Sequence, residues 1–272
     1  MAKFTKTLIA AGLLAASATP AFAADYSGDI HKNDYKWFQF NVMHTIDQLP
    51  YAESEGGYND TYFEMEFGGR SGIFDLYGYV DVFDIFQNRH DDKHNQDNLF
   101  IKFAPRISID AMTGKDLSFG PVQEVYIANL INVGGPDGLF EAMTGLGADV
   151  MVPWFGKMGM NLYARHSTEN QFFVEEEGEW NGYWFAMNWF KPFYTFSNGS
   201  FVAYQGYLDH LFDAKDTSTD GTAMFNGLYW HSDRYAVGYG LKYFNDIYGI
   251  QNGSYGLKTT GFGHYFSVTY KF

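Results

Sequence analysis

The sequence predicts an all-β protein, a transmembrane antiparallel β-barrel of about twelve strands. Three observations support this fold class. Apolar residues recur at every second position through much of the chain, which is the period of a strand and not of a helix. Aromatic residues make up 20% of the chain. Short and long connections alternate between the predicted strands, as periplasmic turns and extracellular loops do in outer-membrane barrels.

The N-terminus has the features of a secretory signal peptide, residues 1–23. Two lysines precede an apolar run at residues 8–18, which is too short to cross a bilayer as a helix. Ala21 and Ala23 match the small-residue rule for cleavage. We expect a single outer-membrane barrel domain in residues 24–272. A short amphipathic helix or anchor is the alternative for the leader.

Composition excludes several classes of site. The chain has no Cys, which excludes disulfides and thiolate metal sites. Its formal net charge of −14 argues against nucleic-acid binding, which needs a basic surface. No stretch after the leader approaches the roughly 20 apolar residues of a transmembrane helix. His90 and His94 have a metal-like spacing, but their polar segment has no helix signal, so we predict neither a metal nor a cofactor.

The alternation is clearest in two neighbouring segments, 60–69 and 73–86. Their apolar faces are formed by Phe63, Met65, Phe67, Phe74, Leu76, Val80 and Val82. Their opposite faces are polar or aromatic and are formed by Tyr62, Glu64, Glu66, Asp75, Tyr77, Tyr79 and Asp81. Each segment is therefore expected to be a strand with one apolar and one polar face.

In order along the chain, about twelve segments have strand character: 35–46, 60–69, 73–86, 98–110, 118–131, 143–152, 157–166, 180–190, 200–210, 222–231, 234–244 and 261–272. The connections expected to be short are 68–72, 111–117, 153–156, 197–199 and 232–233. Those expected to be long are 87–97, 132–142, 167–179, 211–221 and 245–260. The last strand is expected to close the barrel against the first, which gives an even strand count.

A soluble β-sandwich or lipocalin-like barrel is the alternative fold. A soluble barrel has a dry interior, where burial of the charged strand faces would be costly. The charges concerned are Glu64, Glu66, Asp75, Asp81, Lys102 and Arg106. Only an exterior that faces outer-membrane lipid, with a water-filled interior, suits both faces.

The chain ends in GHYFSVTYKF, a strand that is apolar on one face. Phe266, Val268, Tyr270 and Phe272 are expected to face lipid, with the last two near the periplasmic interface. A C-terminal Phe on such a strand resembles the assembly signal that the barrel-assembly machinery reads. His264 shares the lipid-facing parity although it is polar, and we expect it near mid-membrane or beyond a local bulge.

Several blocks resemble a known family. NDTYFEMEF (59–67), FDLYGYVD (74–81) and PRISIDAMTGKDLSFGP (105–121) are similar to segments of the nucleoside-specific channel family Tsx. Longer blocks, such as MFNGLYWHSDRYAVGYGLK (224–242), resemble its outer-membrane protein K branch more closely. The resemblance implies a twelve-stranded barrel in the bacterial outer membrane that passes nucleosides. It also implies a role as bacteriophage receptor, for which the K branch is better known.

The predicted lumen is aromatic and charged. Inward parity is expected for Tyr62, Tyr77, Tyr79, Tyr126, Tyr163 and Tyr265, and for the charged residues Glu64, Glu66, Asp75, Asp81, Lys102, Arg106, Asp110, Glu124, Lys157 and Arg165. A nucleoside has a flat base, which tyrosine rings can stack at roughly 1–3 kcal/mol each. Its sugar hydroxyls can hydrogen-bond carboxylates and arginine.

The candidate substrate-binding residues are those that fall in family-matching blocks: Tyr62, Glu64, Glu66, Tyr77, Tyr79, Asp81 and Arg106. The structural alternative is that these residues only brace the barrel wall. For Arg106 this means an ion pair with Glu64, Glu66 or Asp81.

The sequence therefore predicts a channel for passive diffusion of nucleosides and similar small solutes. The alternative is a surface interaction protein that acts mainly as a bacteriophage receptor through its extracellular loops. We do not predict an enzyme, because no His has a Ser two positions away on the same strand face.

Overall fold

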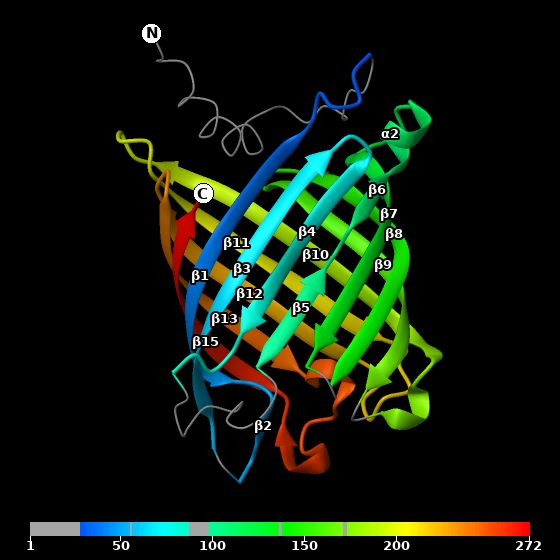
Figure 1. Ribbon diagram of the computed structural model, residues 1–272, viewed down its shortest axis with the longest axis vertical. Coiled ribbons are helices and arrows are strands. Elements are labelled where there is room, and N and C mark those ends of the chain that lie inside the picture. The colour runs from blue at the N-terminus through cyan, green and yellow to red at the C-terminus, as the bar shows by residue number, and fades with distance from the viewer. Residues whose placement is uncertain (1–27, 55, 87–97, 136–137, 171–172) are drawn as a thin grey trace.

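The computed structural model describes residues 28–54, 56–86, 98–135, 138–170 and 173–272. They form a barrel in which the start of the first strand and the end of the last lie at the same rim (Figure 1). We call this rim the terminal end and the opposite rim the loop end. The predicted leader and the pair His90 and His94 lie outside the described residues. Within the described part of the chain, no helix is long and apolar enough to cross a membrane.

The barrel wall is one antiparallel sheet. Its first strands are β1 (Tyr35–Gln48), β3 (Tyr58–Ser71), β4 (Phe74–Val82), β5 (Leu99–Phe103), β6 (Arg106–Ser108), β7 (Val122–Gly134) and β8 (Leu139–Val152). The remaining strands are β9 (Gly156–Asn170), β10 (Glu179–Thr195), β11 (Phe201–Phe212), β12 (Gly221–His231), β13 (Tyr235–Asn245) and β15 (Gly261–Lys271). Strands that follow one another along the chain are neighbours in the wall.

The sheet closes on itself because β1 pairs with β3 on one side and with β15 on the other. β5 and β6 share one position, since both pair with β4 and with β7. The 13 strands of the sheet therefore fill twelve positions around the described barrel. The predicted fold class, an antiparallel barrel of about twelve strands, is confirmed.

Apolar and polar residues are distributed between the two faces of the wall as the alternation predicts. Large apolar residues on the outer face are exposed, among them Val42, Phe74, Val82, Leu146, Leu162, Val237, Phe266 and Val268. Polar residues on the inner face are buried, among them Asn41, Asp75, Asp81, Glu124, Arg165, Ser267 and Thr269. This is the reverse of a soluble protein, in which apolar side chains are the buried ones.

The strand predicted at 98–110 is interrupted. Pro105 has no N–H to donate to the sheet, and it separates β5 from β6. The register nevertheless continues across the break, because Gly78 pairs with Phe103 and Asp75 with Arg106. After Ser108 the chain turns into the short helix α2 (Ile109–Thr113), which begins where the Ser108 hydroxyl accepts a hydrogen bond from the Ala111 amide at 3.0 Å.

Strict alternation of short and long connections is wrong at two places. The segment 132–142, predicted as a long loop, is mostly strand, because β7 ends at Gly134 and β8 begins at Leu139. Its polar residues face the barrel interior, where the Asn132 amide donates to Glu141 at 3.2 Å. The connection predicted to be short at 111–117 is longer, because residues 109–121 include α2.

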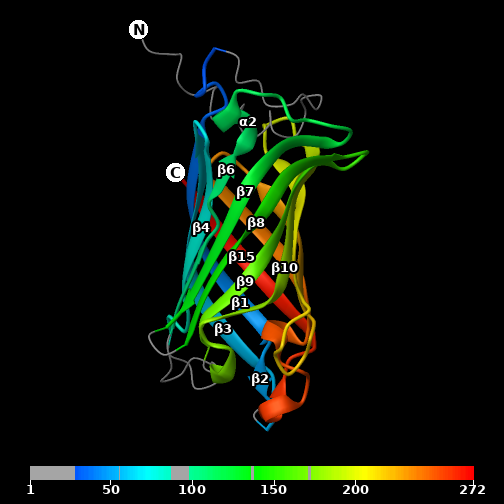
Figure 2. The same cartoon turned by 90° about the vertical axis from the view of Figure 1, so that its right-hand side faces the viewer.

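Apart from the connection that contains α2, the longer connections of the described chain lie at the loop end, where they add small elements (Figure 2). These are the two-stranded sheet of β2 (Tyr51–Ala52) and β14 (Leu257–Lys258), and the turns η1 (Val174–Glu176), η2 (Ile247–Gly249) and η3 (Ser254–Gly256). Asp246 holds one of these connections through the Thr260 hydroxyl and the Asn252 amide, at 3.1 and 2.9 Å.

The last strand pairs with β1 and β13 in a regular register around His264. Of the two alternatives considered for His264, the one that placed it beyond a local bulge is therefore wrong. Instead, the imidazole stacks on the Tyr239 ring of β13, and its Nδ1 lies 2.8 Å from the Tyr239 hydroxyl. At the terminal end, the Phe272 ring contacts Phe38 and Phe40 of β1, with centroids 5.2 and 5.1 Å apart.

Candidate functional site

The barrel encloses a cavity of about 2550 Å³. Its lining extends from Asp34 at the terminal end to Tyr248 at the loop end. All seven predicted substrate-binding residues, Tyr62, Glu64, Glu66, Tyr77, Tyr79, Asp81 and Arg106, line it. Six of them lie together on β3 and β4, and Arg106 lies apart on β6.

Carboxylates and amides alternate with one another on the wall formed by β1, β3 and β4. Asn41 Nδ2 donates to Glu64 at 2.5 Å and to Glu66 at 3.3 Å. Glu66 also accepts hydrogen bonds from Gln39 Nε2 at 2.6 Å and from the Tyr77 hydroxyl at 2.9 Å. These donors fix the Glu66 carboxylate and turn the Tyr77 ring toward it. Asn41 and Gln39 were missed from the sequence, although the inward parity of β1 could have suggested them.

Aromatic rings follow one another along the same wall. Trp37 lies 6.2 Å from Tyr77, measured between ring centroids, and Tyr77 lies 6.2 Å from Tyr79. Tyr79 lies 6.0 Å from Phe100 of β5. Nearer the loop end, Tyr62 lies 5.1 Å from Phe83. These spacings are typical of aromatic pairs in contact, so the rings form an almost continuous aromatic surface.

Further aromatic rings line the cavity from β11 and β12. Tyr207 and Phe225 are stacked, with centroids 5.9 Å apart. Glycine leaves the room for these rings, because a Cβ at Gly240 would collide with the Phe225 ring. In the same way, a Cβ at Gly238 would collide with the Tyr229 ring. The rings therefore lie close against the wall.

Side chains from the loop-end connections pack against the inner wall. Residues of the wall and of the connections pack together there in one buried cluster: Met43, Leu49, Tyr62, Ala223, Phe244, Ile247 and Tyr265. Leu49 and Ile247 come from the connections that carry β2 and η2. Both side chains also line the cavity.

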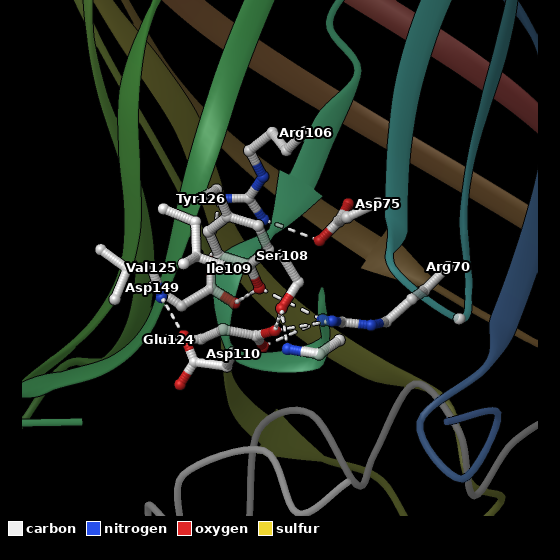
Figure 3. Close-up of polar contacts among 12 residues, drawn as sticks. Arg70, Asp75, Arg106, Ser108, Ile109, Asp110, Glu124, Val125, Tyr126 and Asp149 are labelled. Atoms are coloured by element: carbon white, nitrogen blue, oxygen red, sulfur yellow. Dashed lines mark hydrogen bonds and ion pairs between the residues drawn. The ribbon is translucent and has the colours of Figure 1, made fainter. Parts of the chain in front are cut away.

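Arg106 belongs to an ion-pair network nearer the terminal end (Figure 3). Its guanidinium contacts Asp75 at 2.8 Å and Asp149 at 3.0 Å, and lies 4.0 Å from the centroid of the Tyr126 ring. Lys157 adds a third contact, to Asp149 at 3.0 Å. The partners Glu64, Glu66 and Asp81 considered for Arg106 are therefore wrong. Its contacts are those of a brace across β4, β6 and β8.

A second ion pair lies beside this network. Arg70 donates to Glu124 at 2.6 and 2.9 Å, and Glu124 also accepts a hydrogen bond from Ser108 (Figure 3). Asp110, expected to face the lumen, instead lies in α2. There its carboxylate accepts hydrogen bonds from the amides of Leu117 and Val125, at 2.9 and 3.1 Å, and so holds α2 against β7.

A third network lies nearer the loop end. Arg165 contacts Glu141 at 2.6 Å and Asp216 at 2.8 Å, and all three side chains are almost fully buried. Asp216 also accepts a hydrogen bond from Asn181 at 2.6 Å. Arg165 therefore ties the connection between β11 and β12 to the inner wall. The pairing joins residues 51 positions apart, so the sequence pattern alone could not reveal it.

Comparison with known proteins identifies the family. The model of the family described as "Nucleoside-specific channel-forming protein, Tsx" matches residues 32–272. The chain belongs to this family. An outer membrane protein OmpK of Vibrio parahaemolyticus is 57% identical over 98% of this chain and 99% of its own length. The nucleoside-specific channel-forming proteins Tsx of Klebsiella pneumoniae and Salmonella typhimurium are 28% and 29% identical, over 98% and 96% of this chain and 99% of their own lengths.

Membership of the Tsx family agrees with the resemblance seen in the sequence blocks and makes this a porin-like protein of the bacterial outer membrane. It also makes a channel the general function. The lumen described above is therefore the candidate functional site. The roles of individual lumen residues in solute binding stay predictions.

Arg165→Ala should destabilise the barrel strongly. The substitution leaves Glu141 and Asp216 buried without their cation, so we expect the free energy of unfolding to fall by about 3–5 kcal/mol. Urea unfolding of the protein in liposomes measures this change. Lys215→Ala is the control, because Lys215 is exposed and lies 4.0 Å from Glu176; it should change stability by less than about 1 kcal/mol. Equal effects of the two substitutions would contradict the prediction.

Proposed function

We propose that this protein is a channel through which nucleosides and similar small solutes diffuse passively across the outer membrane. One observation carries the proposal: the row of rings from Trp37 through Tyr77 and Tyr79 to Phe100 lies beside carboxylates on one wall of the cavity. The family description and the relatives named as nucleoside-specific channels support it. Transport of this kind follows the concentration gradient and uses no cofactor.

The chemistry of the wall suits the two parts of a nucleoside. A flat base can move from ring to ring, since neighbouring centroids lie 6.0–6.2 Å apart, and each stacking contact contributes about 1–3 kcal/mol. Hydroxyl groups of the sugar can donate hydrogen bonds to Glu64 and Glu66. Several weak sites in series favour flux, because a solute must leave each site as readily as it enters.

Tyr77→Ala combined with Tyr79→Ala should weaken nucleoside binding in the lumen. Loss of two stacking surfaces is expected to lower the apparent affinity by about tenfold or more. Nucleoside block of ion current through single channels in planar bilayers measures it. Tyr183→Ala combined with Tyr235→Ala is the matched control, because both tyrosines are exposed on the outer face. Unchanged nucleoside block in the lumen variant would contradict the assignment of Tyr77 and Tyr79 to the binding site.

We also propose that the last strand is the assembly signal, read by the barrel-assembly machinery through Phe266, Val268, Tyr270 and Phe272. The first two are exposed on the outer face, and the Phe272 ring covers the outer face of β1. The terminal end then faces the periplasm.

Deletion of Phe272 should reduce insertion into the outer membrane more than it alters conduction. The deletion removes ring contacts with Phe38 and Phe40 and the hydrogen bond from the Phe272 amide to the Phe38 carbonyl. The yield of heat-modifiable barrel in outer-membrane fractions measures insertion. Phe262→Ala, also exposed and on the same strand, is the control. A normal yield after the deletion would contradict the assembly role.

A second candidate function is surface recognition, with a bacteriophage as partner. The observation that favours it is a loop-end surface ordered by the pairing of β2 with β14, on which Tyr248 and Tyr255 are exposed. This function and conduction are compatible.

Tyr255→Ala should lower phage adsorption to cells while nucleoside block of the channel is retained, because Tyr255 does not line the cavity. Adsorption assays with phages that require the intact protein measure the effect. Thr113→Ala in α2, at the terminal end, is the control. Equal adsorption to the Tyr255 variant and the parent would exclude this residue from the recognition surface.

A further inference from the structure

Most carboxylates that line the cavity from the described strands are neutralised by a cation. Five of them lie within 3.0 Å of an arginine or lysine nitrogen: Asp75, Glu124, Glu141, Asp149 and Asp209. Three do not have an ion pair within 4.0 Å among the described residues, and they are neighbours: Glu64, Glu66 and Asp81. The lumen therefore has one region in which acidic side chains are concentrated without a cation partner among the described residues.

The side chains of Glu64 and Asp81 hydrogen-bond each other, and the other contacts of the three acidic groups are with neutral groups. Glu64 and Glu66 accept hydrogen bonds from the amides of Asn41 and Gln39, and Glu66 also from Tyr77. Asp81 is only 6% exposed, and its Oδ1 is buried with no hydrogen-bond partner in the described part of the chain. A buried carboxylate oxygen left in this state is costly, which indicates that a ligand supplies the missing partner.

The register of β3 and β4 adds to the free-energy cost of burying these acidic side chains. Glu64 of β3 and Asp81 of β4 are direct cross-strand partners, and Glu66 is two residues further along the same face. Like charges that face each other across a strand pair repel. A positive group placed between Glu64 and Asp81 would remove the repulsion and would give Asp81 its partner.

The nearby lumen cations Lys102 of β5 and Lys242 of β13 do not provide this group. Lys102 is engaged by Asp209 at 2.9 Å. Lys242 Nζ lies over the rings of Phe244, Tyr265 and Tyr207, at 4.8, 5.6 and 5.7 Å from their centroids. It makes no ion pair within 4.0 Å with any described residue. The ammonium group of Lys242 is therefore held by aromatic rings and not by Glu64 or Asp81.

The surroundings favour an organic cation over a metal ion. No group of three or more His, Asp or Glu side chains among the described residues could hold a metal. The surfaces next to the carboxylates are the rings of Tyr77 and Tyr79, which are 6.2 Å apart. Aromatic faces attract ammonium groups, and carboxylates accept their hydrogen bonds.

We propose that Glu64, Glu66 and Asp81, together with the rings of Tyr77 and Tyr79, form a site in the lumen for solutes that carry a primary aliphatic ammonium group. The ammonium donates to Glu64 and Asp81, and its alkyl chain lies along the rings. The site extends the range of the channel to amines. It does not rest on nucleoside passage, since the ammonium contacts need no base or sugar.

The test uses n-butylammonium chloride as probe, in planar bilayers that contain the full-length mature protein and no nucleoside. At constant ionic strength, replacement of part of the KCl by n-butylammonium chloride should produce resolved interruptions of the single-channel current. Glu64→Gln combined with Asp81→Asn should weaken this block by about tenfold or more, because two charge-assisted hydrogen bonds are lost. Lys242→Gln should strengthen it, because a like charge across the lumen is removed.

A second readout does not depend on conduction. n-Butylammonium chloride should raise the thermal unfolding temperature of the parent protein in detergent relative to KCl at the same ionic strength, since a ligand of the folded state stabilises it. The double variant should show no such rise, and heat-modifiable migration on gels confirms that it is folded.

Three results would overturn the proposal. The first is the absence of block and of thermal stabilisation in the parent. The second is equal block in the parent and the folded double variant. The third is equal block by n-butylammonium and by tetramethylammonium, which cannot donate hydrogen bonds. All three results are obtained without nucleoside, and nucleoside block of the parent protein is measured separately, so failure of this proposal and failure of the proposed function are distinguishable.

Discussion

The backbone pairing between β1 and β15 is the contact on which the rest of the molecule depends. In a bilayer every backbone N–H and C=O group needs a partner within the protein, so an open sheet edge is excluded. Pairing from Gln39 with Lys271 to Ile46 with His264 removes the last two edges. Once the ring of strands is closed, each residue has a fixed side, and the period-two pattern becomes an apolar outer face and a polar lumen face.

Closure also leaves a wide interior, and only side chains can span it. The interior is spanned by ion pairs that reach across several strands, such as Arg106 with Asp149 and Arg165 with Asp216. These pairs occupy the space near the two ends of the barrel. Between them, the wall of β3 and β4 keeps its carboxylates and rings available. Structural charges and candidate binding charges are thus distinguished by their partners, not by their residue type.

The sequence allowed much of the fold to be predicted, because a strand residue's side follows from parity alone. Tyr62 and Glu64 could be placed in the lumen and Phe63 on the outside without knowledge of any neighbour. Partners could not be predicted in this way. The choice of Asp75 and Asp149 for Arg106 depends on which strands are adjacent and on their register, and neither is encoded in the period of one segment. The predicted loop at 132–142 was wrong for a related reason. Asn132 and Glu141 are polar because they make hydrogen bonds and an ion pair inside the barrel, and polarity alone resembles a loop.

The glycines of β13 have a consequence for the evolution of selectivity. Phe225 and Tyr229 lie against the wall only because Gly240 and Gly238, on the next strand, have no side chain. The width of the passage on this side of the lumen therefore depends on residues that no solute contacts. A single added methyl group at either position would push a ring toward the axis and narrow the passage, while all the groups that contact the solute stayed the same. Pore diameter and pore chemistry can thus change independently in this family.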